Sequence, residues 1–291
     1  MAVTERDPHT GYLTTGHEWN GITELNTPVP RVVYFFLIAT AVFSLGYWIL
    51  FPAFPLGWTY TKGLLGIDQR TTVTEALKQA ALERESWTKR IAAESYQQIQ
   101  ADPALMTIVR QTGRTLFGDN CAVCHGFNAK GGMRFPNLTT ASWLWGGDAE
   151  AIAETIRIGI NSSHPNTRVA QMPAFGQILS RAEVENVVGY VQSLSDPTAA
   201  RQISAEKLDD GRKIFAANCA SCHGDDGKGK TDLGAPDLTD AYWVYGGDHQ
   251  SIFTSVSHGR QGQMPTWENR LSAVERKILA LYLVDLRSRN P

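Results

Sequence analysis

The longest apolar stretch of the chain runs from Val32 to Phe51 and contains no charged side chain. A helix of about 20 residues is long enough to cross the hydrocarbon core of a bilayer. Tyr34 lies near one end of the stretch, and Tyr47 and Trp48 lie near the other, where aromatic rings favour the headgroup level. The pattern therefore predicts one transmembrane helix at residues 32–51.

A cleaved signal peptide is the alternative interpretation of this stretch. Signal peptides have a basic start and an apolar core of about 7–15 residues. The first 30 residues of this chain carry four acidic side chains against one arginine, and the apolar run is longer and later than a signal core. A retained helix is therefore favoured.

Residues 52–106 form a predicted helical spacer. Between residues 73 and 100 the chain is rich in Ala, Glu, Lys, Gln and Arg and contains neither Gly nor Pro. Thr72-Val-Thr-Glu75 fits the capping box that begins many helices. The sequence predicts a helix that begins at this box and continues towards Pro103.

Helical periodicity continues through the rest of the chain. The capping boxes Ser180-x-x-Glu183 and Ser272-x-x-Glu275 each begin an apolar stripe at helical spacing. The two stripes consist of Val184, Val187, Val188, Val191 and Leu194, and of Val274, Ile278, Leu281 and Tyr282. Shorter helices are predicted at residues 107–120, 149–158, 205–218 and 249–257. The predicted fold class is all-α.

Residues 107–195 and 205–291 are two copies of one pattern, with a linker at residues 196–204. The blocks of the first copy recur at offsets of 98, 100 and 92 residues. In that order the blocks are Gly113 to Cys121, Trp143-Leu-Trp-Gly-Gly-Asp148, and Met172-Pro173 to Tyr190. Matched blocks separated by small insertions predict two small helical domains of one fold.

Composition narrows the class of partner. The chain is 43% hydrophobic and 19% charged, which is ordinary for folded protein. A formal charge of -2 at pH 7 and the lack of a poly-basic run argue against nucleic acid as a partner.

Two pentapeptides carry the clearest chemical signal, Cys121-Ala-Val-Cys124-His125 and Cys219-Ala-Ser-Cys222-His223. The pattern C-x-x-C-H is the signature of covalent haem c attachment. Two cysteines at this spacing form thioethers to the two vinyl groups of the porphyrin, and the histidine then lies beneath the iron. We expect two covalently bound haems c, with His125 and His223 as the proximal ligands.

Other uses of paired cysteines fit less well. The two pairs lie 98 residues apart, farther than the cysteine pairs of a usual structural zinc site. A thioredoxin-like motif has one pair beside a βαβ pattern, whereas here two pairs are each followed by histidine with little strand signal nearby.

A methionine is expected as the sixth ligand of each iron. Met172 and Met264 are equivalent in the repeat and lie 47 and 41 residues after their proximal histidines. Each precedes a proline, which favours an extended loop, and thioether ligation raises the reduction potential relative to bis-histidine. Which methionine faces which iron stays open, because the loop of one copy can reach the haem of the other. Met133 has no counterpart and is interpreted as packing in a haem pocket.

The other histidines fit an exposed or internally hydrogen-bonded role better than a ligand role. They are His9, His17, His164, His249 and His258. Arg157 and Arg260 lie near the matched glycines Gly159 and Gly259 and are candidates to pair with haem propionates.

The order of these parts resembles a known family. The stretch Gly16-His-Glu-Trp-Asn-Gly-Ile-Thr-Glu-Leu-Asn-Thr-Pro-Val-Pro30 is followed by one span, a helical spacer and two haem c domains. This arrangement is similar to the membrane-anchored di-haem subunit of cbb3-type cytochrome c oxidases, called FixP or CcoP. The resemblance covers essentially the whole chain. After Pro30 the chain reads Arg-Val-Val-Tyr-Phe-Phe, where related subunits often carry paired tryptophans.

The resemblance implies an electron-transfer subunit with two class I cytochrome c-like domains and no catalytic residue. In the family, electrons come from a quinol-oxidising cytochrome bc1 complex or a soluble cytochrome c. They pass through the two haems and a mono-haem sister subunit to a haem–copper subunit that reduces oxygen and pumps protons.

The side of the membrane follows from the haems. Charges flanking the span are balanced and give no orientation. Haem c is assembled on the outer face of the bacterial inner membrane, so residues 52–291 are expected in the periplasm and residues 1–31 in the cytoplasm. Two alternatives stay open: a di-haem cytochrome subunit of a periplasmic dehydrogenase, and a di-haem peroxidase. A peroxidase needs an open iron position, which the paired Met-Pro motifs disfavour.

Overall fold

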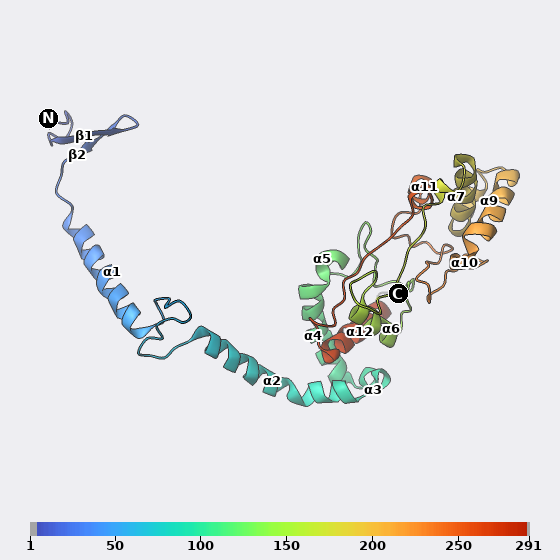
Figure 1. Ribbon diagram of the computed structural model, residues 1–291, viewed down its shortest axis with the longest axis horizontal. Helices are drawn as coiled ribbons and strands as arrows, with labels where there is room; N and C mark the ends of the chain where they lie inside the picture. The colour runs from blue at the N-terminus through green and yellow to red at the C-terminus, as the bar shows by residue number, and fades with distance from the viewer. Residues whose placement is uncertain (1–4, 290–291) are drawn as a thin grey trace. The chain divides into compact units, whose positions relative to one another are not determined.

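The computed structural model describes residues 5–289, in two compact units that are considered separately. The first unit ends at Glu83 and the second begins at Arg84. Figure 1 shows that helices make up most of the described chain, with one two-stranded sheet near the N-terminus. The predicted all-α class is confirmed apart from this small sheet.

The sheet of the first unit is a hairpin of strands β1 (Thr14–Trp19) and β2 (Ile22–Leu25). Asn20 and Gly21 form the turn between them, with φ values of 50° and 86°. Positive φ at both central residues is typical of a type I′ turn, which favours the pair Asn-Gly. The hydrophobic pattern of the sequence does not predict this hairpin, although the Asn20-Gly21 pair signals it.

A helix lies where the sequence predicts a span. Helix α1 (Arg31–Leu50) agrees with the predicted limits to within one residue at each end, and it is long and apolar enough to cross a membrane. None of its residues is buried. A helix that is apolar on all sides requires an apolar surrounding, which a bilayer supplies.

Helix α2 (Gln69–Ala93) begins before the predicted capping box. The Oδ1 of Asp68 accepts the backbone N–H of Arg70 at 2.9 Å, at the start of the helix. Thr72 lies inside the helix and donates its hydroxyl to the carbonyl of Asp68 at 3.1 Å. The predicted box at Thr72 is therefore wrong, because a threonine within a helix can match the same sequence pattern.

The helical spacer is also interrupted before residue 100. Ser95 accepts the backbone N–H of Gln98, and the Gln98 side chain accepts the N–H of Ser95 in return. This reciprocal capping box begins a new helix, α3 (Tyr96–Ala101), so α2 cannot continue through it.

The remaining helices belong to the second unit. They are α4 (Pro103–Asn120), α5 (Ala122–His125), α6 (Ala149–Ile158), α7 (Arg181–Ser195), α8 (Pro197–Ala200), α9 (Ala205–Asn218), α10 (Ala220–His223), α11 (His249–His258) and α12 (Ala273–Ser288), with the 3-10 turn η1 (Phe175–Gln177). The helices predicted at residues 149–158, 205–218 and 249–257 are confirmed to within one residue at each end. Helix α4 begins four residues before its predicted start. Asp102 caps that helix by accepting the N–H groups of Ala104 and Leu105.

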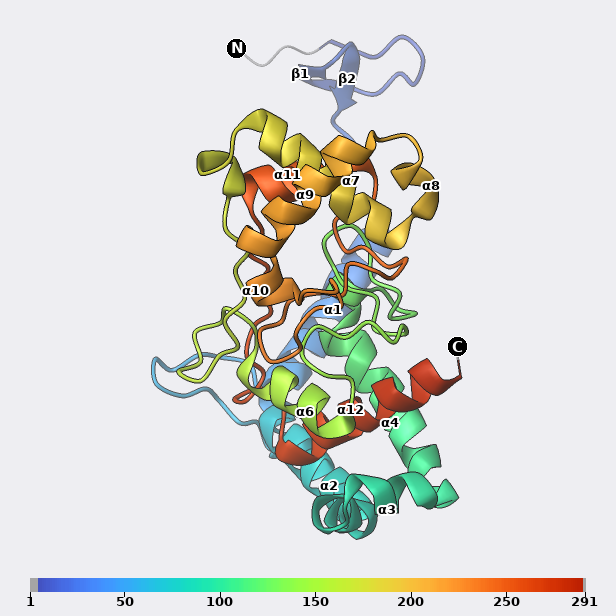
Figure 2. The ribbon, with the colours of Figure 1, turned by 90° about the vertical axis from the view of Figure 1, so that its right-hand side faces the viewer.

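The helices of the second unit pack as two lobes, and each lobe takes its last helix from the other copy. Helix α12 packs against α4 and α6, whereas α7 packs against α9 and α11, as Figures 1 and 2 show. We call α3 to α6 with α12 the first lobe. We call η1, α7 and α9 to α11 the second lobe.

Each lobe has its own apolar core, and an aromatic pair in each core joins the two copies. The rings of Phe117 and Tyr282 lie 6.0 Å apart in the first lobe, and those of Tyr190 and Phe215 lie 5.4 Å apart in the second. The predicted apolar stripes of α7 and α12 face these cores, so that prediction is confirmed. Hydrophobic burial therefore holds the exchanged helices in place.

The chain crosses between the lobes at two matched glycines. Gly159 and Gly259 follow α6 and α11 with φ values of 70° and 72°. A Cβ at Gly159 would lie 2.5 Å from the carbonyl oxygen of Met264, and a Cβ at Gly259 would lie 2.4 Å from that of Met172. Only glycine fits where two backbones cross this closely at positive φ.

The predicted domain limits describe the copies of the sequence. Residues 107–195 supply α4 to α6 to the first lobe and α7 to the second, and residues 205–291 supply α9 to α11 to the second lobe and α12 to the first. Packing therefore follows the lobes, and the limits, with the linker at residues 196–204, stay a prediction.

A matched glycine also lies where each exchanged helix crosses its partner. A Cβ at Gly113 would lie 2.6 Å from the Cβ of Tyr282, and one at Gly211 would lie 2.2 Å from the carbonyl oxygen of Asn186. The helices approach at these points more closely than any side chain permits.

We predict that Gly113→Ala destabilises the chain by about 1–3 kcal/mol, the usual cost of overpacking. Gly118→Ala on the same helix is the control, since nothing lies within 4 Å of a Cβ there. This control should leave stability unchanged or slightly higher, because alanine favours helix. Denaturant unfolding of the purified chain in detergent measures both. Equal midpoints for the two variants would contradict the close crossing.

Candidate haem sites

The first attachment motif lies directly after helix α4. Cys121 is half-buried and Cys124 is exposed. The Nδ1 of His125 lies 3.0 Å from the carbonyl oxygen of Pro136. Because a carbonyl only accepts, Nδ1 carries the proton and Nε2 keeps the lone pair that can bind a metal. Burial lowers the pKa of His125, which keeps the imidazole neutral.

The second motif has the same local structure. Cys219 is buried and Cys222 is exposed. The Nδ1 of His223 lies 3.1 Å from the carbonyl oxygen of Pro236, and burial lowers the pKa of this histidine too. The proline acceptors were not among the predicted site residues, although Pro136 and Pro236 recur at the repeat offset of 100 residues.

The cysteines fit covalent haem better than the alternative uses. Burial raises the pKa of Cys121 and of Cys219 to about 11, whereas a redox dithiol needs a thiol of lowered pKa. The two cysteine pairs pack in different lobes, so they do not form one four-cysteine zinc site. A cysteine pair followed by a neutral, oriented histidine is the donor set that haem c requires.

The two predicted methionines lie crosswise. Met264 packs against the core of the first lobe, which holds Cys121, and Met172 packs against the core of the second lobe, which holds Cys219. Each methionine therefore lies in the lobe of the other copy's attachment motif. At the level of lobes, each methionine is thus a candidate ligand for the haem that the other copy attaches.

Backbone hydrogen bonds fix both methionine segments at the crossing. Ile160 and Met264 exchange two N–H to carbonyl bonds of 2.9 Å each. Met172 and Arg260 exchange two bonds of 2.8 Å and 3.0 Å. A shift of either methionine segment would break bonds with the other copy.

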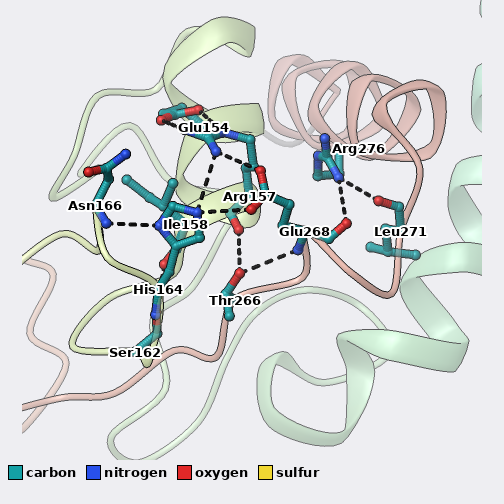
Figure 3. Close-up of polar contacts among 10 residues, drawn as sticks. All are labelled: Glu154, Arg157, Ile158, Ser162, His164, Asn166, Thr266, Glu268, Leu271 and Arg276. Atoms are coloured by element: carbon teal, nitrogen blue, oxygen red, sulfur yellow. Dashed lines mark hydrogen bonds and ion pairs between the residues drawn. The ribbon is translucent and has the colours of Figure 1, made fainter.

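A polar network holds the segment after Met264 on helix α6 (Figure 3). Arg157 donates to Glu268 at 2.7 Å, and the Nε2 of His164 lies 2.9 Å from the other carboxylate oxygen of Glu268. Thr266 donates its hydroxyl to the carbonyl of Arg157 at 2.6 Å. These contacts come from both copies and fix the loop that carries Met264.

The segment after Met172 is held differently. Ala174, Phe175 and Gly176 occupy the positions that match Thr266, Trp267 and Glu268. A Cβ at Gly176 would lie 2.8 Å from the carbonyl oxygen of Ser257 on helix α11. Close backbone packing therefore replaces the polar network, and the two lobes differ in the support of their methionines.

Arg157 and Arg260, which the sequence offers as partners of haem propionates, make different contacts in the structure. Arg157 is held by Glu268 and also donates to Glu154 at 2.7 Å, so its predicted role is not supported. Arg260 stacks on the ring of Tyr245 at 4.4 Å from the centroid, and its Nε donates to Ser255 at 3.0 Å.

The predicted packing of Met133 is not seen among protein contacts, since its side chain is 84% exposed. The histidines outside the motifs fit their predicted roles. His164 is hydrogen-bonded internally, with a side chain 8% exposed, and His9, His17 and His258 are exposed. His249 is also exposed, and its Nε2 lies 3.4 Å from a carboxylate oxygen of Glu185.

Comparison with known proteins identifies the parts of the chain. The N-terminal domain of cytochrome oxidase-cbb3, FixP, matches residues 11–58. The cytochrome c family matches residues 111–195, and cytochrome c oxidase, cbb3-type, subunit III matches residues 206–283. With helix α1, these matches define the class of protein as a membrane-anchored c-type cytochrome with two cytochrome c domains.

Whole-chain relatives narrow the class to one family. Cbb3-type cytochrome c oxidase subunits FixP of Bradyrhizobium sp. (strain ORS 278) and Bradyrhizobium diazoefficiens are each 44% identical over 287 residues, covering 97% of both chains. Subunit CcoP of Azospirillum sp. (strain B510) is 39% identical over 98% of this chain and 99% of its own. The chain belongs to the FixP/CcoP family. This confirms the predicted resemblance to an electron-transfer subunit that is not catalytic by itself.

We predict that Glu268→Gln removes a pH-dependent part of the stability. Hydrogen bonds from Arg157 and His164 hold the pKa of Glu268 below its ordinary value. Such a carboxyl group stabilises the fold above its unfolded pKa, about 4.3, and this contribution disappears as the pH falls through the lower folded pKa. Thermal midpoints should therefore fall more steeply below about pH 5 in the parent chain than in the variant.

The control for this measurement is Asp225→Asn, which makes the same chemical change on an exposed loop. Its pH profile should match that of the parent chain. If Glu268→Gln also follows the parent profile, the network does not stabilise the fold through the Glu268 carboxylate.

Proposed function

We propose that the chain binds two haems c, one in each lobe, and carries electrons through them to the oxygen-reducing subunit of a cbb3-type oxidase. The observation that carries the proposal is the pairing, in each lobe, of a C-x-x-C-H motif with a methionine, in a chain of the FixP/CcoP family. Bound haem supplies a one-electron redox centre at each site.

The proposed ligand sets combine residues of both copies. In the first lobe Cys121 and Cys124 form the thioethers, and His125 and Met264 are the axial ligands. In the second lobe Cys219 and Cys222 form the thioethers, and His223 and Met172 are the axial ligands. Axial positions filled on both sides suit electron transfer and leave no place for peroxide.

The residues of the chain orient and tune these sites. The carbonyls of Pro136 and Pro236 fix the tautomer of the proximal histidines. The apolar cores keep water from the histidine side, which favours the state of lower charge. Methionine as the sixth ligand raises the reduction potential, which suits a relay to an oxygen-reducing centre.

The membrane sets the location of the relay. We place residues 1–31 in the cytoplasm and the haem-binding unit in the periplasm of a bacterium, with α1 as one span of the inner membrane. The electron donor is then a cytochrome bc1 complex or a soluble cytochrome c. The acceptors are the mono-haem and haem–copper subunits of the same oxidase.

A variant with one haem tests the crossed ligand sets. Replacing Cys219 and Cys222 by serine leaves only the first attachment motif. On this background, Met264→Ala should abolish the charge-transfer band of methionine-ligated ferric haem and lower the reduction potential. Met172→Ala should change neither. The opposite result would show that each haem takes its methionine from its own copy.

Purification from native membranes in mild detergent tests the function. Haem b, copper and rapid oxygen uptake should co-purify with the haem c of this chain. Reduced cytochrome c should sustain oxygen uptake by the purified preparation. A flavin or quinone-cofactor dehydrogenase without copper in the same preparation would instead favour the dehydrogenase subunit. Deleting α1 should release the haem-binding unit and abolish co-purification of oxygen uptake.

A further inference from the structure

The peptide group that joins Pro136 to Asn137 makes a hydrogen bond on each side. Its carbonyl accepts the Nδ1 proton of His125 at 3.0 Å. Its N–H, which is the backbone N–H of Asn137, donates to the phenol oxygen of Tyr242. Tyr242 belongs to the second copy, so one peptide group connects the proximal histidine of the first lobe to a side chain of the other copy.

Hydrogen bonds on both sides of Tyr242 fix the segment that carries it. The backbone N–H of Tyr242 donates to Oδ1 of Asp240 at 2.8 Å, and the hydroxyl of Ser142 donates to Oδ2 of the same carboxylate. Beyond Tyr242, the carbonyl of Val244 accepts the backbone N–H of Arg134 at 3.2 Å. Segments of the two copies meet at these bonds, so the phenol oxygen has a defined position.

The phenol is neutral and partly removed from water. Desolvation raises the pKa of Tyr242 above its ordinary value, so the hydroxyl stays protonated at neutral pH. The oxygen of a protonated phenol still accepts through its lone pairs. A hydrogen bond in such partly dry surroundings is electrostatically stronger than the same bond in water.

Two hydrogen bonds through one peptide group reinforce each other. When the N–H of a peptide donates, electron density moves towards its carbonyl oxygen, which then accepts more strongly. A stronger acceptor draws the Nδ1 proton of His125 and makes the imidazole a more basic ligand. Because ferric iron carries the larger positive charge, a more basic imidazole stabilises the ferric state more than the ferrous state.

The second lobe has the same acceptor for its histidine but a different residue at the matched position. The carbonyl of Pro236 lies 3.1 Å from the Nδ1 of His223. At an offset of 100 residues, Ser142 is the counterpart of Tyr242. The described structure gives its hydroxyl another partner, the carboxylate of Asp240. The phenol therefore distinguishes the first proximal histidine from the second.

We propose that Tyr242 tunes the first haem through the peptide group that orients His125. Its phenol oxygen strengthens the hydrogen bond from the histidine to the carbonyl and so lowers the reduction potential of that haem. This inference rests on the proposed function, which supplies the haem and its bond to His125. Tyr242 acts through the peptide and the histidine, so it is a positioning residue.

Spectroelectrochemical titration of the full-length holoprotein in detergent measures the effect. Tyr242→Phe keeps the ring and removes the acceptor oxygen. The equilibrium of one haem should shift about threefold towards the ferrous state, which is roughly 28 mV at 59 mV per tenfold change for one electron. The same rise should occur when Cys219 and Cys222 are replaced by serine, which leaves only the first haem.

Ser142→Ala is the matched control. It removes a hydrogen bond between the copies at the same contact and leaves both the phenol and the Asn137 N–H in place. Neither haem potential should change. A shift as large as that of Tyr242→Phe would assign the effect to packing between the copies and contradict the proposal.

A second variant keeps the shape of the side chain. Incorporation of 3-fluorotyrosine at position 242 retains the hydroxyl but withdraws electron density from its oxygen, which makes it a weaker acceptor. Below the pKa of the fluorinated phenol, the first potential should rise by less than in Tyr242→Phe. A potential equal to that of the parent chain in both variants would sink the proposal.

The iron–histidine stretching band reports on the proximal ligand directly. On the serine background, Met264→Ala should leave a ferrous haem without a sixth ligand, in which resonance Raman spectroscopy detects the stretch between iron and His125. Adding Tyr242→Phe should move this band to lower frequency, because a less basic imidazole binds iron more weakly. Loss of packing alone does not change the basicity of the imidazole.

The outcomes separate this inference from the proposed function. If Tyr242→Phe binds haem with the parent potential and the parent stretching band, the inference is wrong. A downward shift, or a shift confined to the second haem, also overturns it. If the parent chain carries no covalent haem, the proposed function itself fails. If Met264→Ala keeps a methionine-ligated haem, the crossed ligand set fails, and the potential on the serine background still decides the role of Tyr242.

Discussion

The crossing of two backbones at Gly159 and Gly259 is the constraint on which the second unit depends. Each glycine lies against the carbonyl of a methionine from the other copy, at a distance that no Cβ permits. Without this crossing, every methionine and every closing helix would stay with its own attachment motif. With it, neither lobe is complete without both copies. The two sites therefore share one framework.

A common backbone with different side chains makes the two sites unequal. The segment after Met264 is fixed by Arg157, Glu268 and Thr266, whereas the segment after Met172 is fixed by close packing of Gly176. Two redox sites with identical surroundings have identical potentials and give electrons no preferred direction. The polar network in one lobe and its absence from the matched positions of the other supply a physical source of inequality.

Local features of the fold could be predicted because their causes are local. Capping boxes at Ser180 and Ser272 begin their helices as expected, and the histidine of each C-x-x-C-H motif is partly buried and oriented by a backbone carbonyl. Thr72 shows the limit of such patterns, since the carboxylate of Asp68 caps the helix first. The Asn20-Gly21 turn is equally local, but its strands are largely exposed and lack the apolar alternation that predicts a strand.

The exchange between copies could not be predicted from periodicity. The apolar stripes of α7 and α12 have the same spacing. The sequence pattern therefore does not show which of the two helices packs on which core. The path of the longer first copy is hidden for a related reason. Its extra residues follow Gly159, and only the backbone hydrogen bonds show that the chain returns to that glycine at Arg168.

Side chains at the helix crossings explain why the exchanged arrangement is preferred. Arg110 on α4 pairs with Asp285 on α12 at 2.8 Å, across 175 residues. The matched positions of the other crossing are Leu208 and Ser193. Pairing within one copy would place Arg110 opposite Ser193 and the largely buried Asp285 opposite Leu208. The carboxylate of Asp285 would then lose Arg110 and keep Arg289 of its own helix, which lies 2.7 Å away.

The entropy cost of closing the longer loop does not outweigh the stabilisation from the Arg110–Asp285 ion pair. The partner within the same copy, Ser193, lies 83 residues from Arg110, so the exchanged pair closes a loop about twice as long. Each doubling of loop length costs only about 0.6 kcal/mol. Arg110 donates through Nε and Nη2 to the largely buried carboxylate of Asp285, and the loss of these charge-assisted hydrogen bonds costs more than that. The ion pair between Arg110 and Asp285 therefore favours α12 in the first lobe, and α7 is left to complete the second.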